Sequence, residues 1–229
     1  MIDVHTHLLP GIDDGAQSVE EALTMAEKLK LQGVTAAICT PHFNPATMSM
    51  DDFVIRRNNA LKLLTDVKIK IIMASETYLH EYLFHYNDIT PLYVSGTNYI
   101  LIELPFEKKW NENILSNIEK LRYYYGVTPI IAHVERYPML AKNNKSLHYL
   151  KELGCLMQIN TETIMNKKYK KLIDFYMKND YLDVLGTDCH NMTSRSPQMI
   201  GAKELIIQNY GTHRWDVLCE NSKRIIGDR

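Results

Sequence analysis

Residues 1–7 read MIDVHTH and place two histidines directly at the end of the first predicted strand. Residues 2–5 form that strand, and His5 and His7 stand two positions apart. Side chains two positions apart on an extended segment point to the same side, because the period of a strand is two residues. The stretch therefore predicts a strand that delivers two imidazoles together at its carboxyl end.

Short apolar strands alternate with helices along the rest of the chain. Further strands are predicted at 34–39, 69–74, 99–104, 127–132, 156–159 and 183–186. Helices are predicted at 18–32, 51–64, 113–125, 145–153, 168–178 and beyond Pro197 to the end. This alternation predicts a parallel sheet with right-handed crossovers. Strands that are apolar almost throughout indicate a sheet covered on both faces.

Two of these helices carry end signals. Ser18 and Glu21 have the spacing of a capping box, and Gly33 stands where a helix ends in a left-handed glycine. Thr212 is predicted as the N-cap of the last helix.

Six of the seven predicted strands deliver a histidine or a carboxylate at or after their carboxyl end. These residues are His5, His7, Asp13, Asp14, His42, Glu76, Glu103, His133, Asp188 and His190. In a closed barrel all carboxyl ends lie on one rim, whereas in an open sheet they lie in a row. The convergence favours the barrel. Asp13 and Asp14 remain alternatives, because one of them can instead cap a turn before Gly15. The other four histidines are interpreted as structural or surface residues: His80, His85, His148 and His213.

The composition is that of a globular protein of 229 residues, 45% hydrophobic and 23% charged, which excludes disordered and collagen-like chains. Lys and Arg total 26 against 27 Asp and Glu, so no overall field attracts nucleic acid. No apolar run approaches the ~18 residues of a membrane helix, and the start does not resemble a signal peptide. The four cysteines form no CxxC pair, which favours a cytoplasmic protein without disulfides. A single domain is the simplest interpretation.

A ring of imidazoles and carboxylates on one rim predicts a metal centre. Carboxylates this close to one another repel and raise each other's pKa, and divalent cations remove that penalty. Mixed nitrogen and oxygen ligands suit Mn, Fe or Zn better than Ca. Nine candidate ligands exceed the needs of one ion, so two or three ions that share a bridging carboxylate are expected.

Two arginines fall in loops on the same predicted rim. Arg136 lies three residues after His133, and Arg195 lies five residues after His190. A guanidinium binds a pair of phosphate oxygens with two parallel hydrogen bonds. Beside a metal centre, the two arginines predict a phosphoryl substrate.

A competing signal lies in residues 189–196, which have the spacing Cys-x5-Arg-Ser. This resembles the signature loop of cysteine-dependent tyrosine phosphatases, in which a low-pKa thiolate attacks phosphorus. The loop contains no glycine to ease a phosphate cradle. The metal interpretation is favoured, and it requires the Cys189 side chain to point away from the ligands on either side of it.

The ordered motifs together resemble the PHP (polymerase and histidinol phosphatase) superfamily, and more narrowly the bacterial manganese-dependent tyrosine-protein phosphatases of capsule and exopolysaccharide operons. The matching pieces span nearly the whole chain: residues 1–7, 10–15, 40–42, Glu76, 101–103, 131–137 and 188–191. At Val134 and Cys189 the chain departs from the residues usual in those slots, and neither position is a ligand.

The resemblance implies a distorted seven-stranded parallel (β/α)7 barrel, TIM-barrel-like, formed by a single domain over residues 1–229. It implies a trinuclear site, most simply of Mn, with Fe, Zn or Mg as alternatives. The implied ligands are His5, His7, Asp14, His42, Glu76, Glu103, His133, Asp188 and His190, with Glu103 as the bridge. Arg136 and Arg195 match the family's phosphate-binding arginines, and are expected to act in catalysis.

The implied activity is hydrolysis of phosphotyrosine in the tail of a partner bacterial tyrosine kinase, by attack of a metal-bridging hydroxide. Three alternatives stand beside it. One is a small-molecule phosphatase, such as a histidinol-phosphate phosphatase. A second is a regulator that binds phosphorylated tails without turnover. The third, a metal-dependent deacylase of the amidohydrolase type, has no special use for the two arginines.

Overall fold

The protein is described by a computed structural model over residues 1–106, 112–141 and 144–228. Nine strands within these ranges form two parallel sheets. The three-stranded sheet has the order β1-β2-β4, from β1 (Ile2–Thr6), β2 (Ala36–Cys39) and β4 (Lys70–Met73). The six-stranded sheet has the order β3-β5-β6-β7-β8-β9, from β3 (His42–Phe43), β5 (Glu76–Tyr78), β6 (Tyr99–Glu103), β7 (Thr128–Ile131), β8 (Leu156–Asn160) and β9 (Val184–Gly186).

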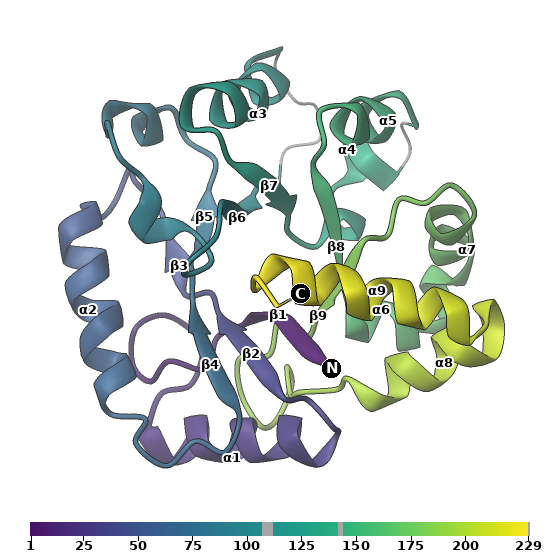
Figure 1. The fold of residues 1–229 in the computed structure, drawn as a ribbon, viewed down its shortest axis with the longest axis horizontal. Coiled ribbons are helices and arrows are strands. Elements are labelled where there is room, and N and C mark those ends of the chain that lie inside the picture. The colour runs from purple at the N-terminus through teal and green to yellow at the C-terminus, as the bar shows by residue number, and fades with distance from the viewer. Residues whose placement is uncertain (107–111, 142–143, 229) are drawn as a thin grey trace.

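The two sheets meet where β1 lies beside the end of β9. A parallel bridge joins Thr6 to Cys189, and the Asp188 N–H donates to the His5 carbonyl at 2.8 Å. Figure 1 shows the strands curling around the centre of the molecule, with most of the helices outside them and the last helix, α9 (Thr212–Ile225), crossing in front of the centre. The first and last strands of the chain are therefore neighbours, and this brings residues near position 5 to residues near position 188.

Each of the seven predicted strand ranges contains a strand, but the predicted single barrel of seven strands is not confirmed. The structure instead has a curled six-stranded parallel sheet next to a three-stranded one. The short strands β3 and β5 were not predicted. Pro41, which has no N–H to donate, separates β2 from β3, and the Glu76 N–H turns to the carbonyls of Thr40 and Pro41 at 3.2 and 3.0 Å.

The α-helices are α1 (Val19–Leu31), α2 (Met50–Lys62), α3 (Glu112–Tyr125), α4 (Pro138–Ala141), α5 (Asn144–Glu152), α6 (Thr161–Met165), α7 (Lys170–Lys178), α8 (Ile200–Tyr210) and α9 (Thr212–Ile225). Short 3-10 turns are η1 (Glu81–His85), η2 (Thr90–Leu92), η3 (Val134–Arg136) and η4 (Lys167–Tyr169). Helices α4 and α6 and the 3-10 turns were not predicted, because they are too short to show a helical period in the sequence.

The cap signals of α1 are confirmed. Ser18 Oγ accepts from the Glu21 N–H at 3.1 Å, and Gly33 has a φ of +83°. The Glu21 carboxylate accepts from the N–H of Gln17 at 3.0 Å, one residue before the position that a capping box predicts. The prediction for Thr212 is wrong by one residue: Gly211, with a φ of +88°, is the N-cap of α9.

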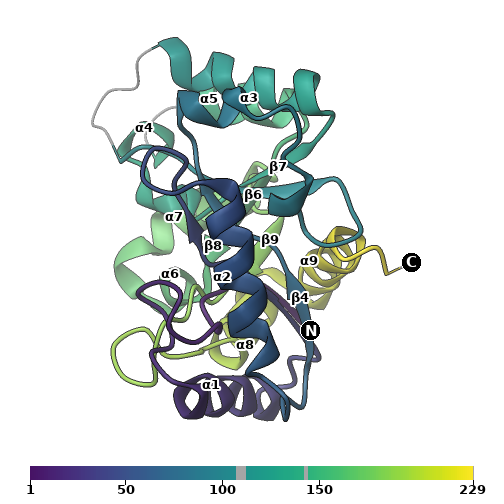
Figure 2. The same ribbon diagram turned by 90° about the vertical axis from the view of Figure 1, so that its left-hand side faces the viewer.

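Most strands are buried on both faces, and the edge strand β4 is partly exposed. One face packs against the outer helices, and the other forms an inner cluster that includes Val4, Ile38, Leu101, Ile130 and Val184. Ile225 of α9 packs into this inner cluster. Helix α9 lies on the side of the molecule where both chain termini are found (Figure 2). Figure 2 shows α9 and the termini on that side and the loops after β1 and β9 on the opposite side. The carboxyl ends of the strands are thus left open for a site.

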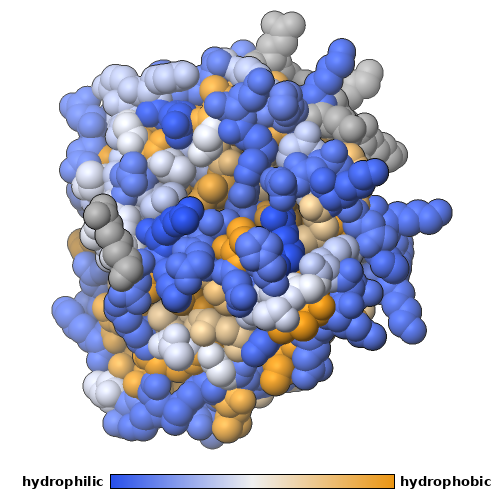
Figure 3. All heavy atoms as spheres, turned by 45° about the vertical axis from the view of Figure 1, so that its right-hand side comes forward, coloured by the Kyte–Doolittle hydropathy of each residue, from blue (hydrophilic) through white to orange (hydrophobic). Residues whose placement is uncertain are grey.

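The surface is mixed. Figure 3 shows one face on which apolar side chains form separate small patches among hydrophilic ones. No helix in the described ranges has the length and apolarity that a bilayer crossing requires.

Candidate metal centre

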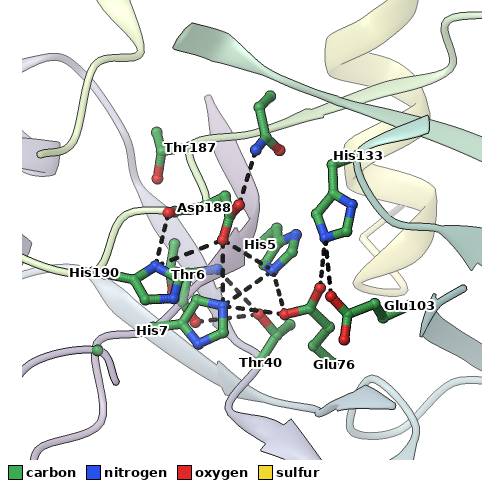
Figure 4. Close-up of polar contacts among 12 residues, drawn as sticks. His5, Thr6, His7, Thr40, Glu76, Glu103, His133, Thr187, Asp188 and His190 are labelled. Atoms are coloured by element: carbon green, nitrogen blue, oxygen red, sulfur yellow. Dashed lines mark hydrogen bonds and ion pairs between the residues drawn. The ribbon is translucent and has the colours of Figure 1, made fainter. Parts of the chain in front are cut away.

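Glu76 lies at the centre of a cluster of four imidazoles that come from three different strand ends. Its Oε2 lies 3.1 Å from His5 Nε2, 3.3 Å from His7 Nε2 and 3.0 Å from His42 Nδ1. Its Oε1 lies 2.7 Å from His133 Nε2. Figure 4 shows Glu76 and Asp188 reaching into the same space from opposite sides of His5 and His7. The curled sheet therefore brings together residues that are spread over most of the chain.

Asp188 completes this space from the loop after β9. Its Oδ1 lies 3.5 Å from His5 Nε2 and 3.4 Å from His7 Nε2. The backbones of Asp188 and His133 are left-handed, with φ values of 51° and 30°. Non-glycine residues adopt this conformation at a cost, and such strain clusters at functional sites.

Eight of the nine predicted ligands fall into three groups of donor atoms that lie within 4.8 Å of one another. The groups are His7, Asp14, His42 and His190; His5, His7, Glu76 and Asp188; and His42, Glu76 and Glu103. The ninth residue, His133, lies 3.8 Å from Glu103 Oε1 as well as beside Glu76. Glu76 occurs in two of the groups and Glu103 in one, so Glu76, rather than the implied Glu103, holds the central position.

The Nδ1 atoms of three histidines are engaged by hydrogen bonds that direct their Nε2 atoms into the cluster. His5 Nδ1 donates to Gln158 Oε1 at 3.1 Å, His7 Nδ1 to Asp13 Oδ2 at 2.8 Å, and His190 Nδ1 to the Asp188 carbonyl at 2.9 Å. Hydrogen bonds of this kind fix the tautomer and ring orientation of metal-ligating histidines.

Several buried polar atoms of the cluster are left without a hydrogen bond. Among the described residues these include Glu76 Oε2, Asp188 Oδ1 and His190 Nε2. His5 Nε2 and His7 Nε2 lie only 3.1 Å apart, with Nδ1 of each ring already used as a donor. Buried polar atoms without partners are costly, and two imidazole lone pairs facing each other repel. Divalent cations bound between these atoms would satisfy all of them, so the donor set fits the predicted ions.

Protons on the histidines and carboxylates contribute to the charge balance of the cluster. Burial and the neighbouring charge of Glu76 raise the pKa of Glu103 to about 7. Burial lowers the pKa of His7, but the hydrogen bond to Asp13 and the nearby carboxylates of Asp188 and Glu76 outweigh burial and hold it well above its usual value. Burial and the charge of His7 lower the pKa of His190 to about 4. Because ligands must lose protons to bind an ion, ion binding at this cluster is expected to release them.

The structure separates the roles of Asp13 and Asp14. Asp13 accepts from His7 Nδ1 and also from the N–H groups of Gly15 and His42, at 2.9 and 3.0 Å. Asp14 is 66% exposed, and its Oδ1 lies 3.3 Å from His42 Nε2 and 3.4 Å from His190 Nε2. Asp13 thus supports the rings, while Asp14 faces the open side of the cluster. The turn packs so closely that a Cβ on Gly15 would lie 2.3 Å from the carbonyl oxygen of His7.

Both predicted arginines converge on one oxygen of Asp188. Arg195 Nη2 lies 2.7 Å from Asp188 Oδ2, and Arg136 Nη1 donates to the same oxygen at 3.4 Å. The arginine side chains are 35% and 45% exposed, so each keeps part of its guanidinium open to solvent. Asp188 therefore joins the buried ligand cluster to two exposed cations on the rim.

The sixth predicted strand, which delivers no histidine or carboxylate, supplies two amides that the sequence analysis missed. Gln158 Oε1 accepts from the His133 N–H at 2.8 Å as well as from His5, and its Nε2 donates to Asn160 Oδ1 at 2.8 Å. Asn160 Nδ2 donates to Asp188 Oδ2 at 2.8 Å. Two polar residues at alternate positions of a buried strand were the available signal.

The structure does not support Cys189 as a nucleophile. Its side chain is fully buried, and burial raises the pKa of the thiol well above its usual value. The loop also uses its own polar groups: the His190 N–H donates to the Arg195 carbonyl at 2.9 Å, and Asn191 Oδ1 accepts from the N–H groups of Thr193 and Arg195. These amides are not available to cradle a phosphate.

The four histidines left out of the predicted site lie outside the three groups. His80, for example, accepts from the Tyr82 N–H at 3.2 Å at the start of η1, and His148 faces Glu152 on the surface at 3.2 Å.

Comparison with known proteins gives consistent matches over the whole chain. The sequence model of a family described as "Capsular polysaccharide synthesis, CpsB/CapC" matches residues 1–227. The tyrosine-protein phosphatase CpsB of Streptococcus pneumoniae is 28% identical over 245 residues, which cover 100% of this chain and 99% of that protein. The tyrosine-protein phosphatase YwqE of Bacillus subtilis is 26% identical over 238 residues, covering 99% and 91%.

The fold of a solved structure also matches this chain over its whole length. It comes from work on YwqE of Bacillus subtilis and CpsB of Streptococcus pneumoniae, described as unique metal-dependent tyrosine phosphatases. The TM-score is 0.85 at 25% sequence identity, and the match covers 100% of this chain and 95% of the other.

Proposed function

The chain belongs to the CpsB/CapC family of capsular polysaccharide synthesis proteins, and from this premise we propose that it is a metal-dependent protein-tyrosine phosphatase. The narrower resemblance predicted from the motifs, to bacterial tyrosine phosphatases of capsule operons, is thereby confirmed. The observation that carries the proposal is the convergence of both arginines on Asp188, whose other oxygen is buried among ligand atoms without hydrogen-bond partners.

The proposed metal centre holds two or three divalent ions, Mn in the first instance, with Fe, Zn or Mg as alternatives. The ligands in this proposal are His5, His7, Asp14, His42, Glu76, Glu103, His133, Asp188 and His190. The central position of Glu76 supports it, in place of Glu103, as the shared carboxylate. The proposal keeps the chain as one domain over residues 1–229, with a barrel-like arrangement in which the contact of β1 with β9 joins the two curled sheets.

When bound, divalent ions would supply Lewis-acid stabilisation of the phosphoryl oxygens and lower the pKa of a coordinated water. The chain's own residues prepare the site for this. Asp13 and Gln158 hold the His7 and His5 rings with Nε2 directed inward. Arg136 and Arg195 bind the non-bridging phosphoryl oxygens and offset the charge that develops there. Asp188, held by Asn160, sets the spacing of the two guanidinium groups.

A phenolate leaves more readily than an alkoxide, because the parent phenol has a pKa of ~10. Release of tyrosine therefore needs less help from a general acid than release of an alcohol does. The physiological substrate that we propose is a phosphotyrosine-containing tail of a bacterial tyrosine kinase in the cytoplasm, as the resemblance implied. A small phosphomonoester such as histidinol phosphate and binding without turnover are the alternatives that the experiment below separates.

The experiment compares a phosphotyrosyl peptide, the same peptide with phosphoserine, and histidinol phosphate, each with Mn²⁺-loaded protein and after chelation. We expect the phosphotyrosyl peptide to have the highest kcat/KM, with activity lost in chelator and restored by Mn²⁺. Faster turnover of histidinol phosphate would favour the small-molecule alternative. Tight binding of the phosphotyrosyl peptide without turnover would favour a regulator.

Cys189→Ala tests the thiolate alternative directly. Because the thiol is buried with a raised pKa, we expect kcat/KM for the phosphotyrosyl peptide to change by less than about threefold, whereas a lost nucleophile costs ~10⁴-fold or more. The measurement pairs kcat/KM with a thermal unfolding curve, which detects any packing defect. Inactivity of a well-folded Cys189→Ala protein that still binds Mn²⁺ would contradict the metal-dependent mechanism.

A further inference from the structure

Phe106 is an aromatic side chain left half exposed beside the metal centre. It lies three residues beyond Glu103, the last residue of β6, and is 49% exposed. Its ring stacks with that of His133, at a centroid distance of 5.7 Å and an interplanar angle of 21°. Scattered apolar residues on a surface are ordinary. The position of this one, in contact with a proposed ligand, is what calls for an explanation.

The Phe106 ring also lies against the proposed phosphate-binding residue Arg136. The guanidinium carbon of Arg136 is 5.1 Å from the ring centroid. The same guanidinium donates to Asp188 and is 45% exposed. A phosphate bound at Arg136 therefore lies close to an aromatic surface as well as to the ligand cluster.

The ring is held in place by the buried residue beneath it. Phe106 stacks on Tyr137 at a centroid distance of 5.1 Å and an interplanar angle of 28°, and Tyr137 is fully buried. Tyr137 Oη accepts from the Leu104 N–H at 2.9 Å, which ties the chain two residues before Phe106 to the same side chain. Pro105, whose φ is restricted, stands between them. The aromatic surface is thus largely formed before any ligand arrives, which reduces the entropy lost on binding.

We propose that Phe106 forms an aromatic subsite that binds the ring of an aryl phosphate whose phosphoryl group is bound by Arg136 and Arg195. The inference rests on the proposed function and adds a residue that would favour phosphotyrosine over phosphoserine. In an aryl phosphate a single oxygen separates phosphorus from the ring, so the ring lies next to the phosphate-binding guanidinium. Aromatic pairs gain free energy by stacking beyond the burial of apolar area. The short aliphatic chain of a phosphoserine has no ring to place there.

A second role for Phe106 is distinguishable from this one. The cation–π contact could act only by holding Arg136 in position, which would affect every phosphate ligand equally. A subsite for the ring affects aryl ligands and leaves alkyl ligands unchanged. The two roles are therefore separated by comparing ligands that share a phosphonate and differ in the ring.

The experiment measures by calorimetry the affinity of Mn²⁺-loaded protein for benzylphosphonate and for methylphosphonate. For Phe106→Ala we expect the preference for benzylphosphonate to fall by roughly 2- to 10-fold, with methylphosphonate affinity unchanged. Phe106→Tyr, which keeps the ring, should retain the preference. Tyr123→Ala, which removes a 75% exposed ring on α3, is the matched control and should also retain it.

Three results would overturn the inference. Equal weakening of both phosphonates in Phe106→Ala would assign the residue a role only through Arg136. An unchanged preference in Phe106→Ala would remove the subsite, as would loss of the preference in Phe106→Tyr. Failure of the unmodified protein to hydrolyse the phosphotyrosyl peptide is a separate result: it would reject the proposed function, while the two affinities still report on the subsite.

Discussion

Glu76→Gln is expected to lower kcat/KM for a phosphotyrosyl peptide by at least about 100-fold and to reduce the bound Mn²⁺. Mutation of residues that only support metal ligands already lowers metal affinity or activity by ~10- to 100-fold. Glu76 does more, because its two oxygens contact His5, His7, His42 and His133 directly. Glutamine has nearly the same shape, but it has no negative charge and presents one oxygen instead of two. Ion affinity and reaction should therefore fall together.

The measurement for Glu76→Gln combines elemental analysis of bound metal with kinetics at saturating Mn²⁺. Glu152→Gln is the matched control, because it also removes a Glu–His contact, of 3.2 Å, but one that is exposed on the surface. Surface ion pairs of this kind contribute little to stability. Normal metal content and normal kcat/KM in Glu76→Gln would show that the central carboxylate is not a ligand.

Arg195→Ala is expected to lower kcat/KM by about 100- to 1,000-fold, the range found when a donor that stabilises transition-state charge is removed. Its Nη2 lies 2.7 Å from Asp188 Oδ2 and its Nη1 lies 3.8 Å from Asp14 Oδ2, and the side chain is 35% exposed on the rim. Arg195→Lys should recover only part of the loss, because an ammonium group cannot make two parallel hydrogen bonds to one phosphate.

Bound metal distinguishes this second prediction from the first. Arg195→Ala should keep its Mn²⁺, because Arg195 contacts a ligand residue without being a ligand. Arg224→Ala changes an exposed arginine in the last turn of α9, on the side of the sheets away from the rim, and should leave kcat/KM unchanged. Full activity in Arg195→Ala, or loss of its metal together with its activity, would contradict the proposed role in phosphate binding.

The strands and most helices could be predicted from the sequence because their signals are local. Apolar runs identified seven of the nine strands in the described ranges, and Ser18 and Gly33 marked the ends of α1. The sites of the candidate ligands could be predicted as well, because each stands at or soon after the end of such a run. What the sequence could not give is the division of β2 from β3 at Pro41, since that depends on how neighbouring strands pair.

The central position of Glu76 is a consequence of the same pairing. Residues His42 of β3 and Glu76 of β5 are register partners, and this places the Glu76 side chain among the histidines. Glu103 follows at the end of the next strand and reaches the cluster from its edge. A difference of one strand in a curled sheet decides which carboxylate lies at the centre of the cluster, and no local pattern in the sequence records it.

The supporting residues were missed for a different reason. Gln158 and Asn160 are neutral amides, and a search for imidazoles and carboxylates passes over them. Their hydrogen bonds to His5, His133 and Asp188 exist only because β8 lies between β7 and β9 in the sheet. Likewise, the choice between Asp13 and Asp14 depends on the tight turn that packs Gly15 against the His7 backbone.

The most direct test of the account is anomalous diffraction from crystals of the protein grown with Mn²⁺, which locates bound manganese independently of any assay. We predict two or three manganese peaks within the space bounded by His5, His42, Glu103, His133 and Asp188, with Glu76 contacting more than one of them. A well-ordered cluster without any manganese peak at saturating Mn²⁺, or with manganese bound only elsewhere on the molecule, would contradict it.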